Sequence, residues 1–87
     1  MRIDLLLNKL CLTKTRSIAK NACDKGLVTL QGKIAKASAE VKAADIVIFN
    51  LYGFSHTIRI EKIPAGNVAK KDVTEYYSLL SRSEIAN

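Results

Sequence analysis

Basic side chains are concentrated in the first 36 residues, where they are suited to binding phosphate groups. This stretch holds eight lysines and arginines against two acidic residues, whereas residues 37–87 hold six of each, so it carries the whole formal net charge of +6. Excess charge confined to one part of a chain indicates a surface for a polyanion; the alternative is a solvated basic face with no ligand. Arginine engages phosphate through a planar fork, and lysine acts as a mobile point charge.

Other kinds of chemistry find little support in the sequence. His56 is the only histidine, and no spacing assembles a Ser/His/Asp or Cys/His arrangement around it. The four glycines form neither a dinucleotide fingerprint nor a P-loop. Cys11 and Cys23 lack the spacing of zinc or redox sites, so we expect reduced core residues, with a disulfide between them as the alternative. We therefore predict a non-enzyme without metal or cofactor.

The length of 87 residues allows one domain, which we predict to span residues 1–87. The longest apolar runs fall far short of the roughly 18 residues that a membrane span requires. Asp4, Asn8 and Lys9 interrupt the only stretch that resembles a signal peptide. We expect a cytoplasmic protein that does not enter the membrane.

Two helices are predicted at the start of the chain. Apolar residues recur at helical spacing from Ile3 to Leu10, and Asp4 suits the first turn because it complements the helix dipole. Thr13 or Thr15 can cap a second helix that ends at Gly26. Its small residues Ala19, Ala22 and Cys23 form one apolar stripe, and Arg16 and Lys20 share the basic face.

Short antiparallel strands follow the helices. The period changes to two over residues 28–30 and 33–35, which predicts a hairpin that turns at Gly32. Residues 46–51 and 56–63 predict a second pair of strands joined at Tyr52 and Gly53. Val73, Tyr76, Tyr77 and Leu80 recur at helical spacing, so Asn67 or Asp72 is expected to cap a final helix. The order predicts an α+β fold in which two N-terminal helices pack on a small antiparallel sheet, with a short C-terminal helix.

Several linked motifs resemble the RNA-binding domain named after ribosomal protein S4. These are Arg2-Ile3-Asp4 at the first helix, residues 14–19 from Lys14 to Ala19 at the second, residues 26–32 at the hairpin, and residues 36–38 before Val41 and Asp45. The resemblance covers the αL RNA-binding motif at about residues 2–48, and residues 49–87 form an extension. It is closest to the free-standing members typified by the fifteen-kilodalton heat-shock protein and the quality-control factor RqcP.

The resemblance implies binding to ribosomal RNA of the large subunit and to tRNA. It implies a role in ribosome-associated quality control of stalled nascent chains, alongside a factor that tails the nascent chain, or in heat-shock ribosome recycling. We expect a monomer that reads RNA by shape and charge. Arg2 and Arg16 are expected to orient the RNA, unless they merely pair with Asp4 and Asp24. The full set of predicted RNA contacts is Arg2, Lys9, Lys14, Thr15, Arg16, Ser17, Lys20, Lys25, Lys33 and Lys36.

The chain departs from the family pattern at three positions. Leu5 stands where the family often has a basic residue, Gln31 where it often has Asn before Gly, and Ala44 where it often has Gly. Two other functions stay open at this point. The chain resembles the accessory domains of pseudouridine synthases and tRNA synthetases, and a basic second helix is compatible with a DNA-binding regulator.

Overall fold

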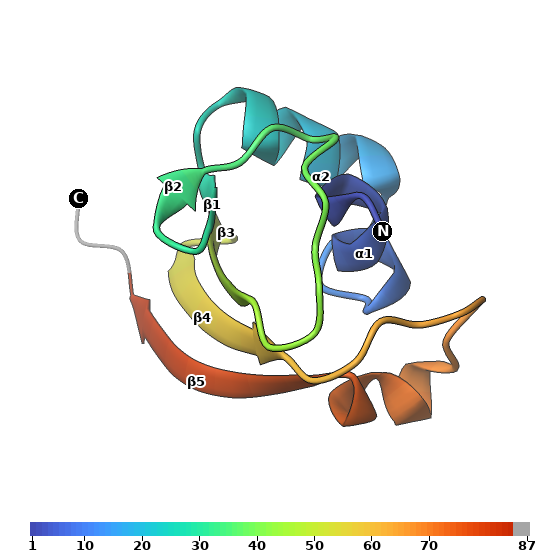
Figure 1. Cartoon of the computed structure of the whole chain (residues 1–87). Coiled ribbons are helices and arrows are strands. Elements are labelled where there is room, and N and C mark those ends of the chain that lie inside the picture. Colours follow the sequence, from blue (N-terminus) through green and yellow to red (C-terminus); the bar gives the residue numbers. More distant parts are fainter. Residues whose placement is uncertain (85–87) are drawn as a thin grey trace.

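Two helices cover one face of a five-stranded antiparallel sheet in the computed structural model, which describes residues 1–84 (Figure 1). The sheet order is β2-β1-β3-β4-β5. The elements are α1 (Ile3–Lys9), α2 (Arg16–Asp24), β1 (Val28–Leu30), β2 (Lys33–Ile34), β3 (Ile46–Leu51), β4 (Phe54–Ile60), the 3-10 helix η1 (Lys70–Glu75) and β5 (Tyr77–Glu84). The predicted α+β fold is confirmed. Over residues 1–84, no helix has the length and apolar composition to cross a bilayer.

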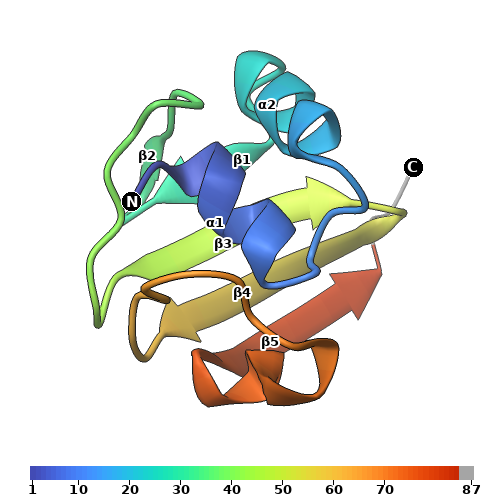
Figure 2. The same cartoon turned by 90° about the vertical axis from the view of Figure 1, so that its right-hand side faces the viewer.

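The core lies between α1 and the concave face of the sheet. Figure 2 shows α1 in front of β3 and β4, with α2 above it. The predicted apolar face of α1 is buried, since Ile3, Leu6, Leu7 and Leu10 are at most 1% exposed. Burying one such side chain stabilises the fold by roughly 1.5–3 kcal/mol, so this single face fixes α1 against the sheet. The sheet contributes Val28, Val47, Phe49, Ile58 and Ile60 to the same cluster.

The ends of α2 are set by two side-chain and backbone features that the sequence indicated. Thr15 is the N-cap, and its hydroxyl oxygen accepts a hydrogen bond from the backbone N–H of Ile18 at 3.2 Å. At the other end Gly26 adopts a φ of 74°, and the next residue, Leu27, donates its N–H to the carbonyl of Ala22. This is the Schellman pattern that glycine favours. Arg16 therefore lies in the first turn of α2.

Both hairpins turn through two residues with positive φ. Gln31 and Gly32 have φ values of 51° and 83°, and Tyr52 and Gly53 have 56° and 80°. Such pairs are typical of type I′ turns, which match the twist of the flanking strands. A positive φ strains Gln31. A hydrogen bond offsets part of this strain, since the side-chain oxygen of Gln31 accepts from the N–H of Ile46 at 3.0 Å.

The predicted C-terminal helix is correct only in its first part. Lys70–Glu75 form a 3-10 helix, in which residues three apart share a face, so Val73 and Tyr76 meet the predicted spacing. Tyr77–Glu84 are instead strand β5, paired along β4. The backbone hydrogen bonds offered by the open edge of β4 override the helical spacing of these residues. Strand β4 is also shorter at its end than predicted, since it spans Phe54–Ile60.

The two cysteines differ in environment. Cys23 is buried, as predicted, and its burial together with the nearby Asp4 charge raises the pKa of its thiol to about 11. Cys11 is exposed, so its predicted place in the core is wrong. It has a φ of 58° just after α1, where the chain turns outward. Both thiols are free, and a disulfide between them is not formed.

A strained turn precedes β3, and it contains Ala44, one of the three positions at which this chain departs from the family pattern. The N–H of Asp45 donates to the carbonyl of Lys42 at 3.2 Å, and Ala44, the third residue of this turn, has a φ of 75°. A positive φ at the third position is what a type II turn requires, and it favours glycine. The alanine Cβ therefore carries strain that glycine would relieve.

Replacing Ala44 by glycine is predicted to stabilise the protein by about 0.5–1 kcal/mol, because relief of the strain exceeds the greater unfolded-state freedom of glycine. The melting temperature should rise by a few degrees, roughly 2–6 °C. Ala43→Gly is the matched control, since the exposed neighbour does not have a positive φ and should lose stability. A lower melting temperature for A44G than for the parent would contradict the strain argument.

His56 is the one histidine of the chain, and it packs on an aromatic ring of the core. Its imidazole stacks on Phe49 with 4.7 Å between ring centroids and 19° between planes. Partial burial lowers the pKa of His56 below its ordinary value of 6.5, and the Arg82 charge lowers it further. These contacts describe a histidine that is packed in strand β4.

Stability is predicted to fall as the pH drops from about 7.5 to about 5.5. The unfolded chain, with an ordinary histidine pKa near 6.5, binds a proton more readily than the folded chain, so stability is full above that value and lost below it. Thermal unfolding at both pH values measures this loss. The variant His56→Gln should show a smaller loss, and an unchanged pH dependence in H56Q would rule out His56 as its source.

Candidate nucleic-acid interface

A buried carboxylate joins the two arginines that the sequence singles out. The side chain of Asp4 is 2% exposed, and its Oδ2 lies 3.2 Å from Nη2 of Arg2 and 3.4 Å from Nε of Arg16. The other oxygen, Oδ1, accepts a hydrogen bond from the backbone N–H of Leu5 at 2.7 Å. We call this arrangement the Arg2–Asp4–Arg16 triad. It brings the start of α1 and the start of α2 to one place.

The segment that joins β2 to β3 fixes the triad through backbone hydrogen bonds. The N–H of Ile3 donates to the carbonyl of Ala39 at 2.8 Å, and the N–H of Asp4 donates to the carbonyl of Ala37 at 3.3 Å. These carbonyls satisfy N–H groups that the first turn of a helix leaves without intrahelical partners. The amino terminus also forms an ion pair with Glu40 at 3.0 Å. The start of α1 is therefore fixed against the rest of the chain.

The outward sides of both arginines remain accessible. The side chains of Arg2 and Arg16 are 47% and 48% exposed. A guanidinium carries five N–H groups, and the contact to Asp4 uses one nitrogen of each. The alternative prediction, that both arginines only pair with Asp4 and Asp24, is correct for Asp4, with which both form ion pairs. It is wrong for Asp24, with which neither arginine pairs among the described residues. The triad keeps one net positive charge.

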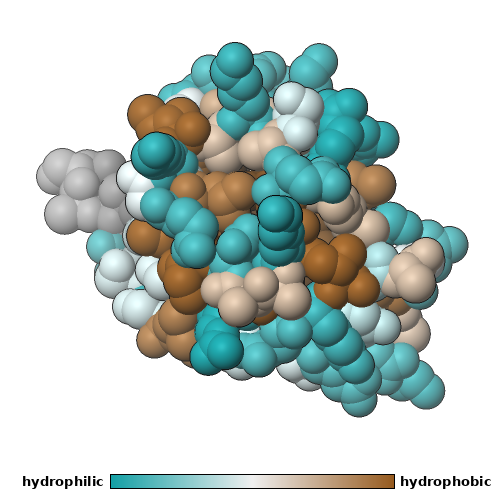
Figure 3. Space-filling view, in the orientation of Figure 1, coloured by the Kyte–Doolittle hydropathy of each residue, from teal (hydrophilic) through white to brown (hydrophobic). Residues whose placement is uncertain are grey.

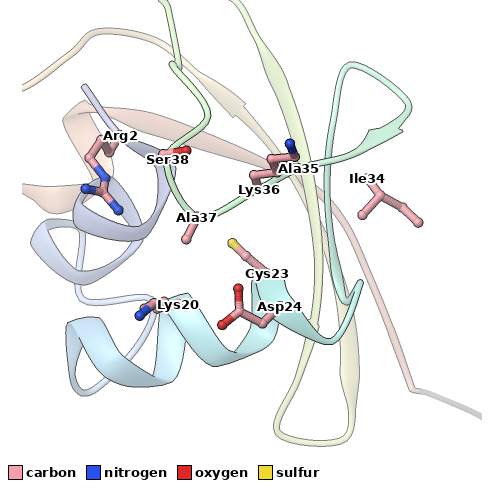
Figure 4. Close-up of a pocket in the computed structure, with 9 residues that line it drawn as sticks. All are labelled: Arg2, Lys20, Cys23, Asp24, Ile34, Ala35, Lys36, Ala37 and Ser38. Atoms are coloured by element: carbon pink, nitrogen blue, oxygen red, sulfur yellow. The ribbon is translucent and has the colours of Figure 1, made fainter.

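A groove runs from the triad along α2 to the β1–β2 hairpin. Its first hollow, of about 290 Å³, is lined by the triad together with Ser17 and Lys20. A second, of about 490 Å³, continues between Lys20 and the 35–38 loop (Figure 4). A third, of about 360 Å³, reaches Lys33. The cations and hydroxyl along this basic groove are Arg2, Arg16, Ser17, Lys20, Lys33 and Lys36.

Much of the surface above these hollows is hydrophilic. In Figure 3, which keeps the orientation of Figure 1, hydrophilic residues cover much of the upper part of the view, where α2 lies. Asp4 and Asp24 are the acidic side chains among the residues that line the groove. Against five cations they leave a net charge of +3, so the groove attracts anions.

Four of the predicted contact residues lie outside the groove or are engaged elsewhere. Lys9 donates to the side-chain oxygen of Asn67 at 3.4 Å. Lys14 lines a different hollow, beyond the other end of α1. Lys25 is the C-cap of α2 and is not among the residues lining the groove. Thr15 uses its hydroxyl oxygen to cap α2.

Sequence reasoning missed that Asp4 is buried and joins both arginines, because it considered this residue only for the helix dipole and for an ion pair that competes with RNA binding. The available signal was an acid placed two residues after Arg2 inside a strongly basic segment. The 35–38 loop as a wall of the groove was also missed. Residues 36–38 are part of the family resemblance and Lys36 is a predicted contact, but only the folded chain shows that this loop lies beside α1 and α2.

Comparison with known proteins places these features in a family. The model of the S4 domain matches residues 1–47. A relative from Helicobacter pylori named RQC P-site tRNA stabilizing factor is 42% identical over 77 residues, which cover 87% of this chain and 92% of the relative. A protein of the same name from Listeria innocua is 32% identical over 80 residues, covering 92% of this chain and 86% of the relative.

Solved structures share the whole fold. Heat Shock Protein 15 of Vibrio cholerae, solved as a trimer, superposes with a TM-score of 0.86 at 28% identity, covering 93% of this chain and 82% of that one. A hypothetical protein solved in solution gives a TM-score of 0.80 at 39% identity, with 93% and 98% covered. Together with the matched S4 motif and the relatives, these structures show that the chain belongs to the S4-domain family of RQC P-site tRNA stabilizing factors.

Proposed function

We propose that the basic groove binds the backbone of structured RNA on the large ribosomal subunit and its tRNA, during quality control of stalled nascent chains. The observation that carries the proposal is the Arg2–Asp4–Arg16 triad, which holds two half-exposed guanidiniums beside Lys20 at one end of the groove. Planar forks fixed in this way suit phosphate oxygens, which they engage in pairs of hydrogen bonds.

The names of the relatives support the ribosomal setting. Proteins called RQC P-site tRNA stabilizing factor match 87% or more of this chain. By the same role, this chain would hold the tRNA in position while a partner factor extends the stalled nascent chain. It would act as a cytoplasmic, monomeric binding protein and not as a catalyst. Heat-shock recycling is the second candidate, and the more distant Vibrio cholerae neighbour favours it less than the relatives favour quality control.

The other functions fit the groove less well. The relatives are themselves short, since this chain covers 86–98% of their lengths, and this favours a role like theirs over that of an accessory domain in an enzyme. A helix-turn-helix regulator reads bases with one projecting helix. Here the cations come from the N-cap of α1, from α2 and from the segment from β2 to residue 36, which suits recognition of a folded backbone by shape and charge.

Arg16→Ala is predicted to weaken binding to a ribosomal RNA hairpin by about 10- to 100-fold, the range for a lost charge-assisted hydrogen bond. The fold should lose about 1 kcal/mol or less, because Arg2 still faces Asp4 and the lost pair was half-exposed. If about six phosphates of the duplex are neutralised, the slope of log K against log salt is near −5, and R16A should reduce its size by about one. Binding titrations between about 50 and 200 mM salt measure both effects.

The matched control is Arg59→Ala, which removes the same charge from the opposite face of the sheet, where Arg59 pairs with Glu61. It should bind RNA almost as the parent does. A pull-down of the tagged protein from lysate tests the ribosomal setting. The parent should bring down large subunits that carry peptidyl-tRNA, and R16A should bring down fewer of them. Equal losses in R59A and R16A would contradict a specific groove.

A further inference from the structure

A second hollow lies at the opposite end of α1 from the triad. It has a volume of about 350 Å³ and opens between the loop that joins α1 to α2 and the turn that joins β3 to β4. Its lining residues are Cys11, Leu12, Lys14, Phe49, Tyr52 and His56. We call it the aromatic hollow. The function proposed above uses none of these residues, since Lys14, although predicted as an RNA contact, lies outside the basic groove.

Tyr52 forms an exposed aromatic wall of this hollow. It is 55% exposed, although an aromatic ring that only closed the edge of the core would be buried. Its position is fixed, because it sits at a φ of 56° in the turn and its hydroxyl oxygen accepts a hydrogen bond from the N–H of Lys14 at 3.4 Å. A fixed and exposed ring is a platform on which a flat, unpaired nucleobase can stack.

His56 contributes a second flat surface, and the buried ring of Phe49 supports it. Phe49 is 1% exposed, and His56 stacks on it at 4.7 Å. Burial lowers the pKa of His56 and so favours the neutral imidazole, whose one N–H is engaged by the backbone of Leu51 and whose other ring nitrogen remains as an acceptor. The edge of a nucleobase presents donors that suit such an acceptor. Flat apolar surface with one polar group therefore matches a base better than it matches an aliphatic side chain.

Positive charge beside the aromatic hollow suits the phosphates of the same strand. A neighbouring hollow of about 320 Å³ shares Cys11 and Lys14 with it and is also lined by Lys70 of η1. Lys14 and Lys70 are both exposed. Arg82 of β5 pairs with His56 in the sheet, and its guanidinium carbon lies 4.3 Å from the ring centre of Phe54. Cations around an aromatic platform are the usual features of single-stranded nucleic-acid sites.

We propose that the aromatic hollow binds one unpaired nucleobase of an RNA whose duplex lies in the basic groove, with adjacent phosphates against Lys14 and Lys70. This inference rests on the proposed function, since the groove supplies the duplex contact. Arg2 precedes α1 and Cys11 follows it, and a helix of seven residues is about 10 Å long. With about 3.4 Å per stacked nucleotide, roughly three nucleotides span that distance.

The test compares a ribosomal RNA hairpin without an extension against the same hairpin carrying four single-stranded adenosines at its 3′ or its 5′ end. For the parent protein, the extension at one end should tighten binding by at least about fivefold, the lower range for stacking of one base. A third hairpin carries abasic riboses in place of adenosines. It keeps the phosphates, so it should lose most of the gain without any change to the protein.

Tyr52→Ala should abolish the gain from the extension and leave the affinity for the plain hairpin within about twofold. Tyr52→Phe keeps the ring and should keep most of the gain. Leu79→Ala is the matched control, because it removes another large exposed side chain that does not line the hollow. Lys70→Gln should reduce the gain by a smaller factor. Thermal unfolding of each variant identifies any that fails to fold, and the abasic hairpin tests the parent directly.

Two results would overturn the inference. One is an equal affinity of the parent for the adenosine and abasic extensions, and the other is an undiminished gain in folded Y52A. A different result would contradict the proposed function, namely an equal affinity of the parent and R16A for the plain hairpin. A base-dependent gain that requires Tyr52 would then uphold the aromatic hollow as a base site and overturn only the duplex contact in the groove.

Discussion

The arrangement of the proposed interface depends on the buried carboxylate of Asp4. A buried charge is strongly unfavourable unless it is paired and hydrogen-bonded. Here two guanidiniums and the N–H of Leu5 satisfy it, and its place in the first turn of α1 is favoured by the helix dipole. The same contacts restrict two long side chains that would otherwise sample many rotamers. Arg2 and Arg16 therefore present their free N–H groups to solvent with little conformational entropy left to lose on binding.

The rest of the fold supplies the conditions for this contact. The apolar face of α1 fixes the helix on β3 and β4, and the carbonyls of Ala37 and Ala39 fix its first turn. The capping threonine sets where α2 begins and so where Arg16 lies. The same small core thus positions a basic groove at one end of α1 and the aromatic hollow at the other. The two proposed RNA sites are therefore separated by one short helix.

Much of this fold follows from local patterns in the sequence. The helical spacing of the residues from Ile3 to Leu10 and the glycines at positions 26, 32 and 53 predict elements that the structure confirms. Strand β5 was not predicted, because its pairing depends on the distant edge of β4 and its sequence does not alternate cleanly. The charge pattern indicated which segment is basic. It could not show that Arg2, Arg16 and Lys36 converge while Lys9 does not, since that depends on how the 35–38 loop packs.

The most direct test of the central claim is the RNA affinity of Asp4→Asn at one fixed salt concentration. The substitution raises the net charge by one, and charge alone would tighten binding. If Asp4 positions the arginines, D4N should instead bind the ribosomal RNA hairpin more weakly, by about threefold or more. Asp24→Asn makes the same charge change in the groove, outside the triad, and should bind more tightly. Tighter binding by folded D4N, equal to that of D24N, would contradict the account.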